Sequence, residues 1–276
     1  MERGGAMGCS GHEVEERQSS NLRCAGALDH EDVQRPQQGG YSCRFVPVSQ
    51  LIARQKLEMA HLYLSSYECA SEADFLRDLE AKDEALLLHA GDHLVGFTTL
   101  RVFDRRWQGA RIRVVYSGDT VVDRRHWGQQ ALAFAWIRRV GELRRTDPGC
   151  PLYWFLLVKG HRTFRFLPAF AKTFYPHWRQ GSADLKLLAD ALALEMFPDD
   201  YNPSSGVVEF ETSRGQLRAE IAQPTTAARS REEVRFFLAR NPGYMRGHEL
   251  VCLCELDEGN LKPLARRLFL KQHHAA

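Results

Sequence analysis

Residues 121–130, VVDRRHWGQQ, carry the residue types most suited to chemistry in this chain. A β-branched run ends there in a turn, and an apolar helical pattern follows. Gly128 allows the turn backbone to approach a ligand closely, and Arg124 and Arg125 add positive charge. The N–H groups of such a turn and the positive end of the following helix dipole favour anions. The segment therefore predicts a site for a phosphate-bearing ligand.

The elements that must position this turn follow from hydrophobic periodicity. Ser71, with Asp74 three residues later, predicts a helix N-terminus, and Gly91-Asp92 predicts a hairpin turn. Residues 151–158, PLYWFLLV, form an apolar run typical of a strand buried on both faces. The predicted order is strand 41–48, helix 50–67, a helix from Ser71, strands 84–90 and 94–103, a strand from Val114, the turn, a helix to about Arg145, and strand 151–158.

This order and the turn resemble the GNAT superfamily of acyl-CoA N-acyltransferases over residues 41–180. The family's pyrophosphate loop has the form Arg/Gln-x-x-Gly-x-Gly/Ala, which residues 125–130 match except at Gln130. A second register, beginning at Trp127, fits about as well. The resemblance implies an α/β fold with a mixed, mostly antiparallel central sheet flanked by helices. It also implies that an acyl donor is held by Val121, Val122, Arg124, Arg125, His126, Trp127, Gly128, Gln129 and Gln130.

The resemblance further implies where catalysis would occur, because the family's motif strand splays from the next strand beside the donor carbonyl. Tyr116, Ser117 and Asp119 occupy the end of that strand, and Asp119 is the leading candidate for a general base. A structural role for Asp119, as a cap or as the partner of an arginine, is the alternative.

The general acid is less clear from the sequence. Residues 159–178 resemble the family region in which a tyrosine protonates the leaving thiolate, but Phe164 and Phe166 lie nearest that position. The proton would then come from His161, Thr163, Tyr175 or water.

Three segments are predicted: a disordered tail at residues 1–40, an acyltransferase core at 41–180, and a C-terminal extension at 181–276 that packs on the core. The extension could complete the sheet, wall an acceptor pocket or form a homodimer interface. Its predicted elements are helix 184–197, a hairpin of strands 207–211 and 216–222, helix 232–240, strand 248–256 and helix 261–272.

Charge and cysteine content narrow the function classes. Residues 101–145 hold eleven arginines against four acidic residues, which favours an anionic donor or, equally, a solvated surface. The seven cysteines are an odd number, and their spacing predicts no metal site; Cys252 and Cys254 share one strand face and are expected in the core. No apolar run approaches the roughly 18 residues of a membrane span, and the N-terminus lacks a signal-peptide core, so a cytoplasmic protein is expected.

The sequence therefore predicts an acyltransferase that moves an acyl group from a thioester to a small-molecule amine. No permanently bound cofactor is expected; the donor would be acyl-coenzyme A or acyl-phosphopantetheine on a carrier protein. Two alternatives remain: transfer from an aminoacyl-tRNA, and a non-catalytic binding or regulatory protein. Nucleic-acid binding through the arginines is weakest, because no recognition signature accompanies them. The acceptor cannot be identified from the sequence.

Overall fold

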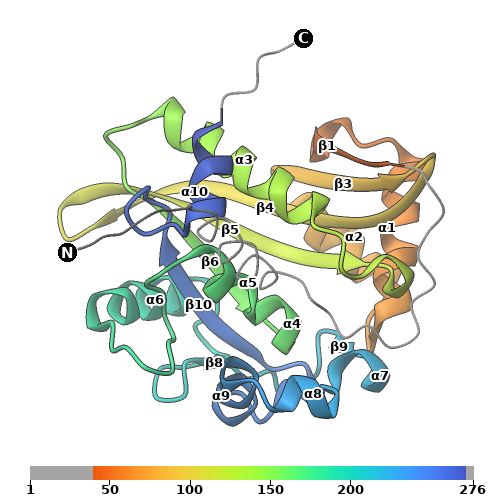
Figure 1. The fold of residues 1–276 in the computed structure, drawn as a ribbon. Coiled ribbons are helices and arrows are strands. Elements are labelled where there is room, and N and C mark those ends of the chain that lie inside the picture. The colour runs from red at the N-terminus through yellow and green to blue at the C-terminus, as the bar shows by residue number, and fades with distance from the viewer. Residues whose placement is uncertain (1–39, 272–276) are drawn as a thin grey trace, which may run out of the picture.

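The fold is built on one eight-stranded sheet with helices on both faces (Figure 1). The computed structural model describes residues 40–271, so the tail predicted at residues 1–40 lies outside the described residues apart from Gly40. In spatial order the strands are β1 (Tyr41–Pro47), β3 (Glu84–Ala90), β4 (His93–Trp107), β5 (Ala110–Val122), β6 (Leu152–Val158), β10 (Glu249–Glu255), β8 (Val207–Val208) and β7 (Tyr201–Asn202). A separate pair joins β2 (Tyr67–Glu68) to β9 (Gln216–Leu217).

Every neighbouring pair in the large sheet is antiparallel except β5 and β6, which are parallel. The predicted fold class, a mixed and mostly antiparallel sheet flanked by helices, is confirmed. The α-helices are α1 (Ala53–Ser66), α2 (Glu72–Glu80), α3 (Ala131–Thr146), α4 (His161–Phe164), α5 (Phe166–Phe170), α6 (Ala183–Met196), α7 (Ala219–Ala222), α8 (Thr226–Arg229), α9 (Glu232–Arg240) and α10 (Pro263–Leu270). Short 3₁₀ turns are η1 (Val48–Gln50), η2 (Arg124–His126) and η3 (Tyr244–Arg246).

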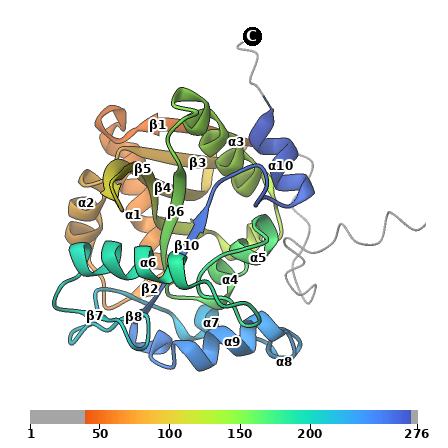
Figure 2. The same cartoon turned by 90° about the vertical axis from the view of Figure 1, so that its left-hand side faces the viewer.

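Three hydrophobic clusters hold the helices on the sheet. Helices α1 and α2 pack on one face of β3 and β4, and α6 packs on the same side of β6 and β10. The opposite face is covered by α3, α5 and α10, and Figure 2 shows the sheet between these two layers. Helix α6 was predicted from residue 184 to 197, helix α9 from 232 to 240 and helix α10 from 261 to 272, and all three exist with boundaries within two residues of those expected. Beyond Ser117, the edge of β5 that faces β6 has no strand paired to it, so this edge is open to a ligand.

Local sequence signals account for several of these elements. The Ser71 side chain caps α2 by accepting a hydrogen bond from the Asp74 backbone N–H at 3.1 Å, as predicted. The Gly91-Asp92 turn joins β3 to β4, also as predicted, and a second hairpin turns at Gln108 and Gly109, both of which have positive φ. The strand predicted from Val114 therefore starts earlier, at Ala110. Strands β4 and β5 of this hairpin are long, and the turn at Arg124–His126 follows directly after the end of β5.

The predicted hairpin between residues 207–211 and 216–222 is wrong. Val207 and Val208 pair with β10 and β7, whereas Gln216 and Leu217 pair with β2. Ser213, Arg214 and Gly215 do form the connection, but the strands on either side pair with different partners that are distant in the sequence. Local turn chemistry alone could not reveal those partners.

Strands β5 and β6 separate before β5 ends. They pair from Arg113 with Leu152 to Ser117 with Leu156, and β5 then continues to Val122 without β6 beside it. The splay implied by the family resemblance is therefore present in the structure. Across the other edge of β5, the pairing with β4 slips at Thr99, where Gly118 and Asp119 stand opposite a single residue. Such a bulge bends the strand and turns the side chains at the bulge in a new direction.

Among residues 40–271, no helix is both long enough and apolar enough to cross a membrane.

Candidate active site

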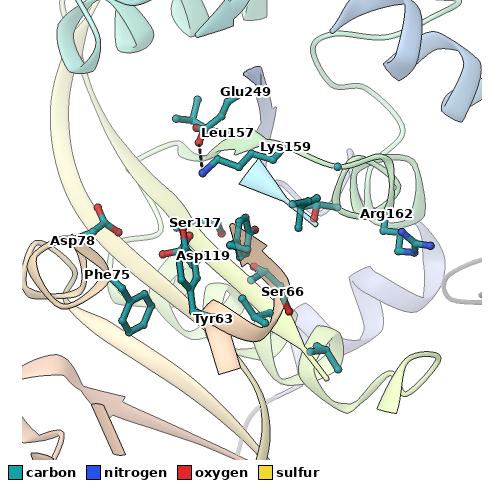
Figure 3. Close-up of a pocket in the computed structure, with 18 of the residues that line it drawn as sticks. Tyr63, Ser66, Phe75, Asp78, Ser117, Asp119, Leu157, Lys159, Arg162 and Glu249 are labelled. Carbon is teal, nitrogen blue, oxygen red and sulfur yellow. Dashed lines mark ion pairs between the residues drawn. The ribbon is translucent and has the colours of Figure 1, made fainter. Parts of the chain in front are cut away.

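A cavity of about 900 Å³ opens where β5 and β6 part (Figure 3). Its walls come from the end of β5, the turn after it, the start of α4, helices α1 and α2, and the segment between α6 and β9. The size is that of a site for a cofactor-sized ligand, within the range of about 300–1,000 Å³. Segments more than a hundred residues apart in the sequence therefore line the same cavity.

Part of the predicted anion loop lines this cavity and part does not. Trp127, Gly128 and Gln129 line it, together with Val121 and Val122. Four further residues predicted to hold the donor do not line the cavity: Arg124, Arg125, His126 and Gln130. Five of the nine residues predicted to hold the donor therefore lie together in the cavity wall.

The loop is fixed by contacts of its own side chains. The Trp127 indole donates a hydrogen bond to the Val122 carbonyl at 2.9 Å, and the Arg162 guanidinium lies 4.4 Å from the centroid of the indole. The Gln129 side chain accepts from the Leu132 N–H at 3.2 Å, at the start of α3. The indole thus holds the turn against the end of β5, and Arg162 brings a positive charge to its cavity side.

The loop backbone is available to a ligand. Gly128 has φ of +87°, a conformation that favours glycine. Among the described residues, the backbone N–H groups of Gly128, Gln129 and Gln130 have no protein acceptor. Arg125, by contrast, is committed to Asp123 at 2.6 Å and is mostly exposed, so its charge is partly neutralised.

Asp119 stands inside the cavity at the bulge. Burial and the nearby Asp78 carboxylate raise the pKa of Asp119 to about 6, against the opposing effect of Lys159 and Lys82. Within the described residues, its side chain makes no hydrogen bond and no ion pair within 4.0 Å. A carboxylate with a pKa near neutrality and no fixed partner has the properties of a general base.

The charges around Asp119 are paired with one another. Lys159 lies 3.0 Å from Glu249, drawn as a dashed line in Figure 3, and the buried Lys82 lies 2.5 Å from Asp78. Although burial disfavours the ammonium of Lys159, Glu249 raises its pKa above the ordinary value. Lys159 therefore stays positive beside Asp119.

Three tyrosines form the rest of the inner wall. Tyr63 stacks on Tyr67 with ring centroids 4.3 Å apart, and Tyr116 lies under the Lys82 ammonium at 5.7 Å from its centroid. Burial raises the pKa of all three phenols. They therefore remain protonated, as hydrogen-bond donors, at any physiological pH.

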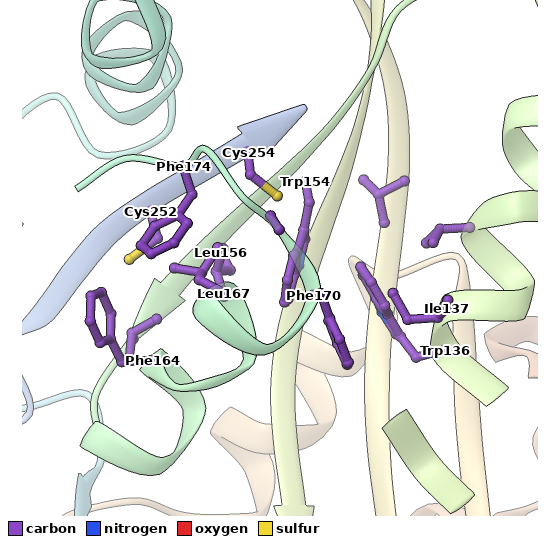
Figure 4. Close-up of a cluster of buried hydrophobic side chains, with 14 of the residues drawn as sticks. Trp136, Ile137, Trp154, Leu156, Phe164, Leu167, Phe170, Phe174, Cys252 and Cys254 are labelled. Carbon is purple, nitrogen blue, oxygen red and sulfur yellow. The ribbon is translucent and has the colours of Figure 1, made fainter. Parts of the chain in front are cut away.

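Of the side chains named as candidates for the general acid, only Thr163 lines the cavity. His161 is buried at the start of α4 and Tyr175 pairs with Leu253 on β10; neither belongs to the cavity wall among the described residues. Phe164 and Phe166 were the residues nearest the position where a tyrosine was expected. Phe164 is fully buried among aromatic side chains and packs the core (Figure 4), whereas Phe166 lines the cavity.

The same figure shows that Cys252 and Cys254 point into this cluster from one face of β10. Burial raises the pKa of both thiols. The prediction that they are core cysteines is confirmed.

Sequence reasoning missed Tyr63, Lys159 and Glu249. A signal was present for two of them, because Lys159 directly follows the apolar run of β6 and Glu249 begins the apolar run of β10. A charge at the edge of a buried strand needs a partner. Their pairing required knowledge that β10 is the neighbour of β6. Tyr63 carried no signal beyond an amphipathic helix.

No family model and no curated protein matches the chain. Solved structures are similar over about half of it. A conserved protein of unknown function from Enterococcus faecalis V583, described as a probable N-acyltransferase, has 13% identity and a TM-score of 0.37, with 48% of this chain and 33% of that chain covered. The chain thus spans a third of the Enterococcus protein.

Two further structures show likeness of the same order. The GNAT family N-acetyltransferase YhbS from Escherichia coli, in complex with CoA, has 18% identity and a TM-score of 0.35, covering 48% of this chain and 69% of that chain. An acyl-CoA N-acyltransferase from Pseudomonas aeruginosa has 18% identity and a TM-score of 0.33, covering 42% and 79%. At these scores the likeness carries no inference about chemistry. In its strand order, its parallel β5–β6 pair and the opening between them, the fold of this chain is GNAT-like.

Proposed function

We propose that this chain is an N-acyltransferase that binds a phosphopantetheine thioester, either acyl-coenzyme A or an acyl carrier protein, between β5 and β6. One observation carries the proposal: a single cavity connects the backbone N–H groups of the loop after β5 with the Asp119 carboxylate at the bulge. One end of the cavity therefore suits an anion and the other suits proton transfer.

The donor's phosphates would lie on the N–H groups of Gly128 and Gln129, with Arg162 adjacent. The pantetheine arm would follow residues 118–122 of β5, whose edge toward β6 is open. Amide groups of that arm can then pair with the exposed strand edge as a neighbouring strand would. The thioester would end near Gly118 and Asp119.

The reaction follows from the groups at that point. The acceptor's ammonium loses a proton to Asp119, directly or through a water molecule, and the neutral nitrogen attacks the thioester carbonyl carbon. A carbon–nitrogen bond forms and the carbon–sulfur bond breaks, leaving an amide and a thiolate that takes up a proton as the free thiol. The overall products are amide, thiol and one proton.

The oxyanion of the intermediate would be stabilised by main-chain N–H groups at the bulge. Gly118 and Asp119 have no register partner on β6 and face a single residue on β4. A side chain at Gly118 would collide with Thr99 Oγ1 at 2.4 Å and with Lys82 Cε at 2.6 Å, so this position is restricted to glycine. Preorganised backbone donors at such a position are a strong source of rate enhancement.

Binding of coenzyme A tests the donor half of the proposal. Isothermal titration of the purified chain with coenzyme A should give saturable binding that Gly128→Ala weakens, because alanine disfavours φ of +87° and displaces the loop N–H groups. Gly109→Ala is the matched control: its φ is +82°, and a Cβ there meets nothing within 4 Å on an exposed hairpin. Equal binding by both variants, or no binding by the native chain to coenzyme A and to acyl carrier protein, would overturn the donor site.

A further inference from the structure

Part of the cavity wall is not used by the proposed donor site. That part comes from α2, from Arg101 on β4, and from the segment that follows α6. Met196, Phe197 and Phe210 supply apolar side chains there, and Arg214 also lines the cavity. The acceptor would lie against this part of the wall, because the loop after β5 is assigned to the donor.

Almost every charge in this part of the wall is already neutralised. Asp74 is 2.8 Å from Arg77, Asp78 is paired with Lys82, and Glu249 is paired with Lys159. Each of these pairs joins one carboxylate to one cation, so the pairs themselves add no net charge to the wall. A charged side chain outside such a pair can then contribute to ligand selection.

Two charges in the wall lack such a partner among the described residues. Asp119 has no cation within 4.0 Å, and Arg101 has no carboxylate within 4.0 Å, whereas Arg214, which also lines the cavity, is 3.1 Å from Asp200. The Arg101 guanidinium lies over the Phe103 ring at 5.5 Å from its centroid, and Arg101 lines the cavity. This part of the wall therefore presents one carboxylate and one guanidinium that are in no ion pair within 4.0 Å.

The two groups lie within reach of one small molecule. Arg101 is two residues along β4 from Thr99, which stands opposite the bulge of Gly118 and Asp119, and two residues span about 7 Å along a strand. Side chains two apart on a strand point to the same face. A ligand amine at Asp119 and a ligand anion at the flexible Arg101 side chain can then be contacted together.

Resting on the proposed function, we infer that the acceptor is a small amino acid-like molecule: an amine that also carries a carboxylate and an apolar body. Its amine is held at Asp119, its carboxylate is bound by Arg101, and its apolar part lies on Met196, Phe197 and Phe210. The guanidinium suits this role because it can bind a carboxylate through two parallel hydrogen bonds.

Matched acceptors isolate the carboxylate. Acyl transfer from acetyl-coenzyme A, and from a longer acyl-coenzyme A, is measured with phenylalanine, phenylalaninamide and phenethylamine, which share the ring and the amine. The amide's amine is less basic, so without carboxylate recognition it would react faster than the amino acid. We expect the reverse, with kcat/KM for phenylalanine about 10- to 100-fold above that for the amide, as a charge-assisted contact provides.

Two variants assign the preference to Arg101. Arg101→Gln should raise KM for phenylalanine by about 10- to 100-fold and bring the ratio of amino acid to amide near one or below. Arg106→Gln, an exposed residue of the same strand near the far hairpin, should keep the native ratio. Binding of phenylalanine to the coenzyme A complex, followed by calorimetry, provides a readout that does not depend on turnover.

The outcomes separate the two proposals. If amines are acylated but the amide equals or exceeds the amino acid in native protein, the acceptor inference is wrong and the acyltransferase proposal stands. If the preference persists in Arg101→Gln, Arg101 is not the carboxylate site and the inference is again overturned. If neither coenzyme A nor acyl carrier protein binds and no amine is acylated from either donor, both proposals are overturned.

Discussion

At the scale of single residues, Asp119 decides whether this cavity is a reaction site. Lys159 and Lys82 lower the pKa of Asp119, but burial and the Asp78 carboxylate have the larger effect and raise it to about 6. The structure thus holds Asp119 at the pKa where a group is both deprotonated and basic near neutral pH.

The activity of the native chain should therefore depend on pH through Asp119. The value of kcat/KM should rise with pH through an apparent pKa of about 6, because only the carboxylate can accept the amine proton. Asp119→Asn should lower kcat/KM by roughly 10²- to 10⁴-fold and remove that limb of the profile. Asp92→Asn, in the exposed turn between β3 and β4, is the control and should keep both rate and limb. A limb that survives in Asp119→Asn would assign it to another group.

The raised pKa of Asp119, which favours catalysis, lowers the stability of the folded chain at high pH. The pKa of Asp119 is raised from 3.8 to about 6 on folding, so its contribution to stability is full below pH 3.8 and is lost as pH rises through 6. At pH 8 the native chain therefore holds a carboxylate in an unfavourable place, at a cost on the order of 3 kcal/mol.

Asp119→Asn should accordingly raise the melting temperature at pH 8 more than at pH 5, while it abolishes activity. Thermal denaturation at the two pH values measures this difference. Asp104→Asn should instead lower the melting temperature at neutral pH, because Arg113 and Arg111 stabilise the Asp104 carboxylate and lower its pKa. A destabilised Asp119→Asn at pH 8 would show that the carboxylate is structural.

At the scale of elements, the sequence predicts those whose causes are local. Ser71 with Asp74 specifies the start of α2, Gly91-Asp92 specifies a turn, and the apolar run of β6 specifies a buried strand. The glycine of the loop after β5 also has a local cause, because Gly128 has φ of +87°, a conformation that favours glycine.

What failed depended on partners distant in sequence. The pairs of Val207 with Leu250 and of Leu217 with Tyr67 bring together segments that no local pattern connects. Lys159 and Glu249 likewise meet only because β6 and β10 are neighbours. The Lys159–Glu249 pair in the cavity therefore depends on tertiary packing, whereas the loop at Gly128 depends on local sequence.

The contact between α3 and α10 is an element-scale prediction. A Cβ at Gly141 would lie 2.0 Å from the Phe269 carbonyl oxygen, which also accepts a hydrogen bond from Arg145 at 2.7 Å. Gly141→Ala should therefore push the helices apart and lower the free energy of unfolding by about 1–3 kcal/mol. Gly149→Ala, where a Cβ meets nothing within 4 Å, should change it little. Urea unfolding compares the two, and equal stabilities would show that α10 docks in another way.

At the scale of the whole molecule, residues beyond 180 take part in the central sheet. Strand β10 pairs with β6 from Leu250 to Glu255, and its side chains enter two of the three hydrophobic clusters. Glu249 at its start also supplies the partner of Lys159 in the cavity. The C-terminal segment therefore completes both the sheet and the site.

A fragment of residues 40–180 should consequently fail to fold alone. Removal of β10 would expose β6, an apolar strand, as a long edge, and such edges pair with other chains. We expect aggregated fragment by size-exclusion chromatography, and soluble complex when residues 181–271 are expressed with it. A monomeric 40–180 fragment that binds coenzyme A would contradict this account.

The central claim is that the cavity between β5 and β6 transfers an acyl group with Asp119 as base. Its most direct test is the rate of amide formation, measured by mass spectrometry with acetyl-coenzyme A or a longer acyl-coenzyme A and a set of amines, in native and Asp119→Asn protein matched for coenzyme A affinity. The account predicts amine-dependent product in the native chain and a loss of at least about 100-fold in the variant. Undiminished product formation by Asp119→Asn, or donor binding with no product from any amine, would contradict it.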